Sequence, residues 1–87
     1  MSVTVELTYD MSRALGVPRL EVDDVRTVAD AVRMARARFA EAGEDFEKLT
    51  RVAAVAVNGV LVNYRRGMKT RLSDGDVVAF VKAAAGG

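Results

Sequence analysis

The chain of 87 residues contains no cysteine and no histidine. It can therefore form no disulfide, and thiolate catalysis and nearly all zinc coordination are excluded. No apolar run approaches the roughly 20 residues that cross a bilayer. The opening MSVTVELTYD also lacks the charged and then apolar layout of a secretory signal. We therefore expect a cytoplasmic protein that does not enter a membrane.

The chain also has little net charge. Its 13 basic and 12 acidic residues leave a net charge of +1, so no general field attracts nucleic acid or anionic lipid. Three arginines, Arg26, Arg33 and Arg36, project from one side of a predicted helix, and we interpret them as a solvated face. We expect no nucleic-acid partner.

Catalytic groups are scarce as well. A chain of this length is one domain with room for one core and no deep cleft. No paired carboxylates, nucleophile with a base, or phosphate-binding loop can be assembled from the residues present. We therefore predict that the protein is not itself an enzyme.

The first quarter of the chain predicts two strands. Apolar residues alternate with polar ones from Val3 to Tyr9, which is typical of a strand with one buried face. The pattern lapses between Asp10 and Gly16, and a looser alternation over residues 17–23 predicts a returning strand. Because Pro18 has no amide proton to donate, we expect this second strand at a sheet edge.

A helix is predicted next. Thr27 and Asp30 resemble a capping box, which places the helix start near Val28, and Gly43 is expected to stop the helix after Ala42. One stripe of this helix is apolar, which predicts that it lies against a sheet. The stripe consists of Val28, Ala31, Val32, Ala35, Phe39 and Ala42.

The second half predicts a polar loop and three further strands. Residues 44–48 read as a loop or short turn, and the apolar run 52–57 suits a strand with both faces covered. Asn58 and Gly59 favour a type I′ hairpin into residues 60–62, and a basic loop follows. The turn of residues 74–76 then leads into a strand over 77–81. This order indicates a two-layer α+β domain.

The segment LSDGDVVAFVKAAAGG, residues 72–87, resembles the C-terminal signature of the MoaD and ThiS family of ubiquitin-like sulfur carriers. That signature runs Leu, any residue, AspGlyAsp, an apolar strand and GlyGly, and AlaValAsnGly at 56–59 looks like the family's internal hairpin. The resemblance is closest to MoaD, the small subunit of molybdopterin synthase. It implies a β-grasp fold over residues 1–87, in which a mixed sheet of four to five strands packs on one main helix, with a flexible tail over 82–87.

The resemblance also implies a chemistry. In the family, an adenylyltransferase of the MoeB or ThiF type uses ATP and Mg to convert the terminal carboxylate into an acyl adenylate, and a persulfide sulfur displaces AMP to leave a thiocarboxylate. The attachment site would be Gly87, and Gly86 would allow close access because glycine has no Cβ. The other implied partners are a sulfurtransferase and a MoaE-type large subunit. No cofactor or metal is expected on this chain.

The tail departs from the family pattern. MoaD proteins usually carry ProPro where this sequence has Lys82 and Ala83, followed by Ala84 and Ala85. Proline keeps a tail extended, so the alanines should lose more entropy on docking. The resemblance nevertheless assigns these four positions to partner contact.

Phe80 is also assigned to partner contact, on the condition that Val78 and Phe80 face away from the helix. If Val77, Ala79 and Val81 face away instead, Phe80 belongs to the core.

These observations predict a thiocarboxylate carrier most similar to the small subunit of molybdopterin synthase. Sister carriers that serve thiamine, cysteine or tRNA thiolation remain alternatives, as does a prokaryotic modifier attached to lysines. A different class is a β-grasp interaction module with no chemistry at its tail, which would be indifferent to the loss of Gly87.

Overall fold

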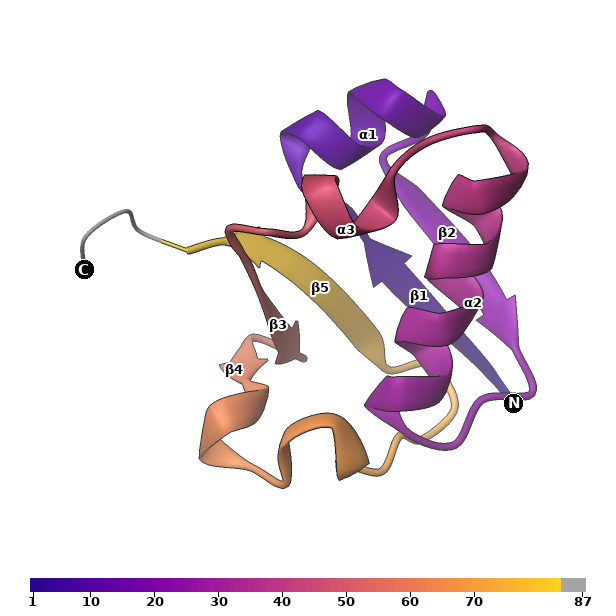
Figure 1. Ribbon diagram of the computed structural model, residues 1–87. Helices are drawn as coiled ribbons and strands as arrows, with labels where there is room; N and C mark the ends of the chain where they lie inside the picture. Colours follow the sequence, from indigo (N-terminus) through magenta and orange to yellow (C-terminus); the bar gives the residue numbers. More distant parts are fainter. Residues whose placement is uncertain (84–87) are drawn as a thin grey trace.

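The computed structural model describes residues 1–83, which form a five-stranded mixed sheet with helices against one face (Figure 1). The sheet order is β2-β1-β5-β3-β4, and only β1 and β5 run parallel. The strands are β1 (Ser2–Glu6), β2 (Arg19–Asp23), β3 (Ala53–Val57), β4 (Val60–Leu61) and β5 (Val77–Lys82). The helices are α1 (Tyr9–Leu15), α2 (Val28–Glu41) and α3 (Phe46–Leu49), with 3-10 turns η1 (Val62–Tyr64) and η2 (Gly67–Lys69). This α+β arrangement is the expected β-grasp fold.

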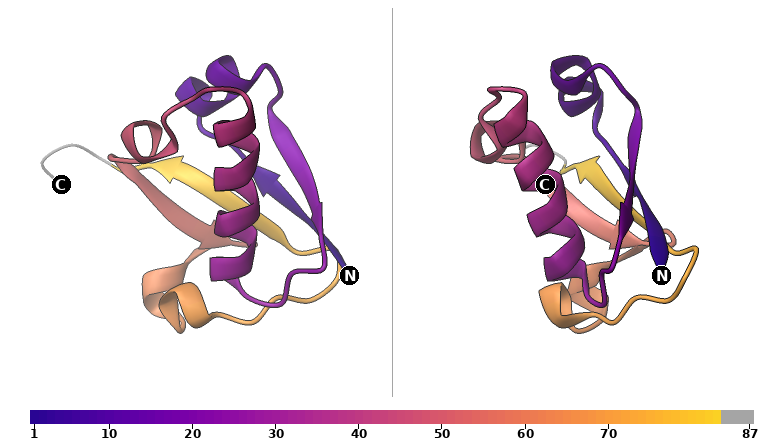
Figure 2. Two further views of the ribbon diagram at one scale, coloured as in Figure 1. Left: turned by 45° about the vertical axis from the view of Figure 1, so that its right-hand side comes forward. Right: turned by 90° about the vertical axis from the view of Figure 1, so that its right-hand side faces the viewer.

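Helix α2 is the main helix of the second layer (Figure 2). The predicted capping box is present, because the amide of Asp30 donates to Thr27 Oγ1 at 3.3 Å and the amide of Thr27 donates to Asp30 Oδ2 at 3.2 Å. Five residues of the predicted apolar stripe are buried, but Ala42 lies just beyond the helix and is exposed. In the described part of the chain, no helix is long and apolar enough to span a bilayer.

The N-terminal strand is shorter than predicted. β1 ends at Glu6, and Thr8 caps α1 by accepting a hydrogen bond from the amide of Met11 at 3.2 Å. Met11 is fully buried, whereas Tyr9, expected on the buried face of a strand, opens the helix and is 71% exposed. β2 lies at the sheet edge, as the proline indicated.

The segment predicted as a polar loop also contains a short helix. Asp45 caps α3 by accepting from the amide of Lys48 at 3.2 Å, and Phe46 packs in the core. The ring centroids of Phe46 and Phe39 lie 5.5 Å apart. A single aromatic residue between charged neighbours gives no periodic signal, so the sequence pattern did not reveal this helix.

The hairpin of β3 and β4 has the predicted two-residue turn. Val57 pairs with Val60, and both turn residues adopt positive φ, 49° at Asn58 and 86° at Gly59. The expectation that β3 is covered on both faces was wrong for most of its length, since only Ala56 and Val57 are buried. The reason is that the main helix packs on one face of the sheet (Figure 2).

Candidate functional site

Strand β5 carries the chain out of the sheet at the candidate site. It lies between β1 and β3, and its pairing with β3 continues to Ala53 opposite Lys82. The amide of Ala83 then donates to the carbonyl of Val52 at 2.7 Å. Lys82 is therefore a strand residue and Ala83 is held by a ladder-type bond, so the boundary expected for the flexible tail was too early. Ala84, Ala85, Gly86 and Gly87 lie outside the described residues.

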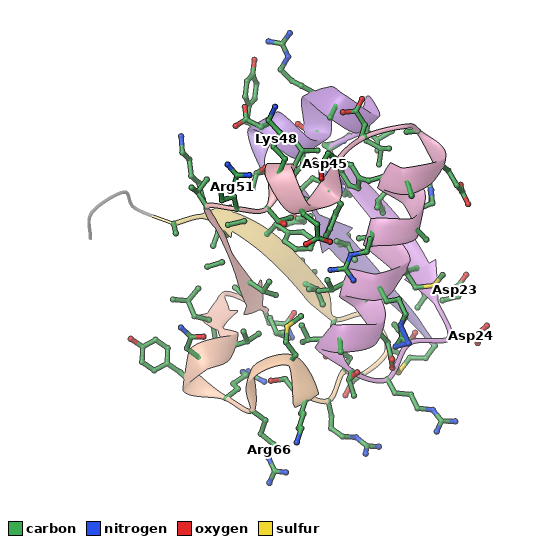
Figure 3. All side chains as sticks on the ribbon, viewed as in Figure 1. Asp23, Asp24, Asp45, Lys48, Arg51 and Arg66 are labelled. Carbon is green, nitrogen blue, oxygen red and sulfur yellow. The ribbon has the colours of Figure 1, made fainter. Side chains whose placement is uncertain are left out.

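A hollow of about 200 Å³ lies beside the end of β5. It is formed by the start of α1, the connection from α3 to β3, and Lys82 at the end of β5. Its lining residues are Thr8, Tyr9, Asp10, Leu49, Val52, Ala53 and Lys82. Lys48 and Arg51 are displayed at the same end of the molecule (Figure 3).

The sequence pattern does not reveal this hollow, because the alternation from Val3 places Tyr9 in a strand and gives no signal at Leu49. A signal was available for α1, because Thr8 can cap a helix and Met11, Ala14 and Leu15 have helical spacing before Gly16.

Phe80 is a core residue, which corrects its assignment to partner contact. It is 5% exposed, faces the helical layer, and its ring meets that of Phe46 edge-on with centroids 5.8 Å apart. Its register partner on β3 is Val55, which packs against the same core. The second of the two expected orientations of β5 is therefore the correct one.

The opposite face of β5 is apolar as well. Val77, Ala79 and Val81 point to this open face, and Val81 is 38% exposed. Register places Ala56 beside Ala79 and Ala54 beside Val81, while Leu61 pairs with Ala56. The apolar stripe thus crosses β5, β3 and β4. On β1 and β2 the same face is polar, where the hydroxyl of Thr4 donates to Glu21 Oε1 at 2.7 Å.

The turn of residues 74–76 has a structural role at the start of β5. The amide of Gly75, whose φ is 84°, donates to the carbonyl of Ser2 at 2.8 Å, and the amide of Ser2 donates to Asp74 Oδ1 at 2.7 Å. Glycine is favoured at this φ because it has no Cβ. The turn therefore fastens β5 to β1 at the end of β5 that is remote from Lys82.

The second aspartate of this turn, Asp76, joins it to the hairpin. Its carboxylate accepts from the amide of Ser73 at 2.8 Å and from Asn58 Nδ2 at 3.0 Å. These two bonds, with a smaller contribution from Arg65, hold the pKa of Asp76 below its usual value against a small opposing effect of burial. Both segments that carry the family resemblance thus belong to one hydrogen-bonded unit.

The hollow beside Lys82 and the open face of β5 are the surfaces of the site among residues 1–83. Within that range no three metal-ligating side chains gather. The other carboxyl with a lowered pKa, that of Asp30, serves the α2 capping box, where the amide of Arg26 is the largest cause of the shift.

Comparisons with known proteins agree with this architecture. The model of the ThiS family matches residues 13–87. A search of curated proteins by sequence found no match. The solution structure of small archaeal modifier protein 1 from Methanosarcina acetivorans is similar with a TM-score of 0.78 and 22% identity, covering 99% of this chain and 96% of that one.

Two further solved structures cover nearly the whole chain. A chain of the Amycolatopsis orientalis BexX/CysO complex has a TM-score of 0.72 and 28% identity, over 98% of this chain and 99% of that one. A Pyrococcus furiosus protein with the provisional name molybdopterin converting factor, subunit 1, has a TM-score of 0.71 and 24% identity, over 97% and 99%. The fold is therefore the one that ubiquitin-like sulfur carriers and modifiers share.

Proposed function

The chain belongs to the ThiS family, and from that membership we propose that it carries sulfur as a thiocarboxylate on Gly87. The observation that carries the proposal is the family match through residue 87, since the family's activated carboxylate belongs to the last glycine of its terminal GlyGly. The position of β5 supports it, since pairing on both sides and the bond from Ala83 to Val52 fix the point from which these residues start.

The proposed chemistry takes place in the partner's active site, where ATP and Mg are bound. A carboxylate oxygen of Gly87 attacks the α-phosphorus of ATP and releases pyrophosphate, which leaves an acyl adenylate. A persulfide sulfur of the sulfurtransferase then attacks the acyl carbon and expels AMP, which gives an acyl disulfide. A thiol cleaves that disulfide, so the thiocarboxylate is released and a disulfide forms on the donor. This chain supplies the acyl carbon and acts as a co-substrate, not as an enzyme, in the cytoplasm where ATP is available.

For the partner surface we propose the apolar stripe of the open sheet face together with the hollow beside Lys82. The stripe, centred on Val77, Ala79 and Val81, takes the contact role first assigned to Phe80. An adenylyltransferase of the MoeB or ThiF type that covers this stripe would receive the residues after Ala83 in its active site. Lys82 and Ala83 then lie at the margin of the interface.

For the recipient of the sulfur we propose a MoaE-type large subunit of molybdopterin synthase. The residues from Asp74 to Phe80 match the MoaD signature, and the similarity to the Pyrococcus furiosus protein supports the same direction. A second candidate is attachment to lysines. The similarity to the Methanosarcina modifier over nearly the whole of both chains favours it, as does the absence of ProPro at Lys82 and Ala83.

The test is activation in vitro. The chain is incubated with a ThiF- or MoeB-type adenylyltransferase, ATP, Mg and a persulfide donor, and its intact mass is measured. We expect one oxygen to be replaced by sulfur, and we expect loss of the conversion when Gly87 is deleted or a residue is added after it. An unchanged wild-type mass with several activating enzymes, while a known carrier is converted in parallel, would reject the proposal.

A second measurement separates the two recipients. Thiocarboxylated chain is offered to a MoaE-type subunit, and cellular proteins are examined after trypsin digestion for lysines that bear an AlaAlaAlaGlyGly remnant, because trypsin cleaves after Lys82. Sulfur delivery without such remnants supports the synthase role. Remnants without delivery would make protein modification the main function.

A further inference from the structure

One continuous segment of the chain contains no acidic residue. Residues 48–73 include six cations, namely Lys48, Arg51, Arg65, Arg66, Lys69 and Arg71, and neither aspartate nor glutamate. The rest of the chain holds the other seven cations and all twelve acids. Four of these cations, Arg65, Arg66, Lys69 and Arg71, lie in or next to the turns η1 and η2, which follow β3 and β4 at one margin of the molecule (Figure 1). Lys48 and Arg51 lie at another end, near Lys82 (Figure 3).

The free edge of β3 lies on this margin. Hydrogen bonds from Asn58 to Val77 and from Ala83 to Val52 fix the alternation of the β3–β5 ladder, so the backbone groups of Ala53 and Val55 point away from β5. On that outer side, β4 pairs only with Ala56 and Val57 before the chain turns into η1. Among residues 1–83, the N–H of Val55 and the C=O of Ala53 therefore have no strand partner.

A hollow of about 350 Å³ adjoins this edge. Every residue that lines it belongs to the acid-free segment, and all but Asn63 are apolar residue types, although backbone polar groups also face the hollow. The lining residues are Ala53, Ala54, Val55, Leu61, Val62, Asn63, Gly67 and Met68. Met68 is 43% exposed, and Tyr64 in the neighbouring turn η1 is 81% exposed.

Hydrogen bonds fix the backbone of the turn η2, which lies beside the hollow and is preceded by Arg66. Thr70 is buried, its hydroxyl donates to the carbonyl of Gly67 at 2.7 Å, and the amide of Arg66 donates to Thr70 Oγ1 at 3.2 Å. The carbonyl of Thr70 accepts from the amide of Val28 at 3.0 Å, which ties the turn to α2. Arg66 extends from this turn into solvent (Figure 3). The cations are thus displayed from a fixed backbone.

We propose that the margin formed by β3, η1 and η2 binds an extended acidic peptide segment of a partner protein. The segment's backbone pairs with the N–H of Val55 and the C=O of Ala53, and an apolar side chain occupies the hollow next to Met68. Its carboxylates face Arg65, Arg66 and Lys69. The free strand edge favours a peptide over a nucleic acid, because its N–H and C=O groups can pair with a peptide backbone. This binding does not depend on the proposed sulfur chemistry.

The test is a titration of the ¹⁵N-labelled chain with an acetylated and amidated peptide, Asp-Glu-Val-Ile-Val-Glu-Asp, followed by amide chemical shifts. We expect saturable shifts at Ala53, Val55, Leu61 and Met68, weakened by added salt. The same peptide with N-methylated backbone amides keeps its charge and side chains but cannot pair with a strand. It should bind about tenfold more weakly, as should a peptide with lysine in place of each acid.

Two double variants provide the matched protein control. Arg65→Glu with Arg66→Glu should weaken binding about tenfold or more, whereas Arg13→Glu with Arg38→Glu makes the same change of charge elsewhere and should change affinity little. Dispersed amide spectra of both variants establish that they are folded. Shifts confined to the open sheet face, equal binding of the N-methylated peptide, or tighter binding of a single-stranded RNA at the same residues would each overturn the proposal.

Discussion

The side-chain amide of Asn58 bridges two loops that meet at the start of β5. Its Nδ2 donates to Asp76 Oδ1 at 3.0 Å, and its Oδ1 accepts from the amide of Val77 at 2.9 Å. The backbone amide of Asn58 donates to the carbonyl of Val77 at 2.9 Å. Asn58 thus holds the start of β5 against the hairpin through three hydrogen bonds.

The first prediction concerns this contact. Asn58→Asp replaces the donor with a second carboxylate facing Asp76, and it should lower the free energy of unfolding at neutral pH by about 1 kcal/mol, because a hydrogen bond between largely exposed groups becomes a repulsion. Urea unfolding of the variant and the wild type measures this difference.

The same substitution should also change how the free energy of unfolding depends on pH. In the wild type the pKa of Asp76 is lowered from 3.8. The ionised carboxylate therefore stabilises the fold above that pH, and this stabilisation is lost as the pH falls through the lowered pKa. In the variant the two carboxylates raise each other's pKa, so the deficit relative to wild type should shrink as the pH falls and one of them is protonated. Asn63→Asp is the control, and an equal pH response in both variants would contradict the role of Asn58.

The second prediction distinguishes the two faces of β5. Phe80→Ala should cost about 3 to 5 kcal/mol of stability, since it removes a buried ring from the cluster with Phe46. Val81→Asp, on the open face, should leave the melting temperature nearly unchanged and weaken binding of the adenylyltransferase. Calorimetry and the Michaelis constant for activation report the two effects separately. A stable Phe80→Ala protein that fails to bind would return the contact role to Phe80.

The third prediction concerns proline at the end of β5. The ladder alternation directs the amide of Lys82 away from β3, and the pairing of β5 with β1 ends at Ala79, whereas the amide of Ala83 donates to Val52. Lys82→Pro should therefore be tolerated, and Ala83→Pro should cost about 1 kcal/mol. Denaturant unfolding of the two single variants tests this order.

The double substitution by ProPro, which the family pattern suggests, should then have opposing effects. It should restrict the chain before partner binding, and it removes one ladder bond. We expect sulfur delivery to a MoaE-type subunit to be retained at a lower melting temperature. Delivery lost in Lys82→Pro alone would show that the amide or the charge of Lys82 is required.

The fourth prediction concerns the start of α2. Asp30 accepts from the amides of Arg26 and Thr27 and pairs with Arg33, which lowers its pKa from 3.8. Its contribution to stability is therefore present above pH 3.8 and is lost as the pH falls through the lowered pKa. Asp30→Asn should reduce the change of stability with pH on the acidic side, while Asp23→Asn, at an exposed position of β2, should not. The melting temperatures of the two variants and the wild type, measured between acidic and neutral pH, test this prediction.

Local features of the chain could be predicted from the sequence because their causes are local. The capping box of Thr27 and Asp30, the turn of Asn58 and Gly59, and the edge position after Pro18 each depend on residues within a few positions. Two short helices were missed, α3 because its four residues leave almost no periodic pattern, and α1 because the strand alternation from Val3 continues to Tyr9. Their caps, Thr8 and Asp45, were the available signals.

The proposed attachment site at Gly87 also came from the sequence, through the spacing of AspGlyAsp, the apolar strand and GlyGly that resembles the family signature. The two faces of β5 could not be distinguished in the same way. Residues 77–81 are all apolar, so a period of two gives no preference for either face. The preference arises where α2 and α3 place Phe39 and Phe46, because their rings fill the space above Phe80 and leave Val81 on the open side. That decision rests on packing between residues more than thirty positions apart, which only the tertiary structure brings together.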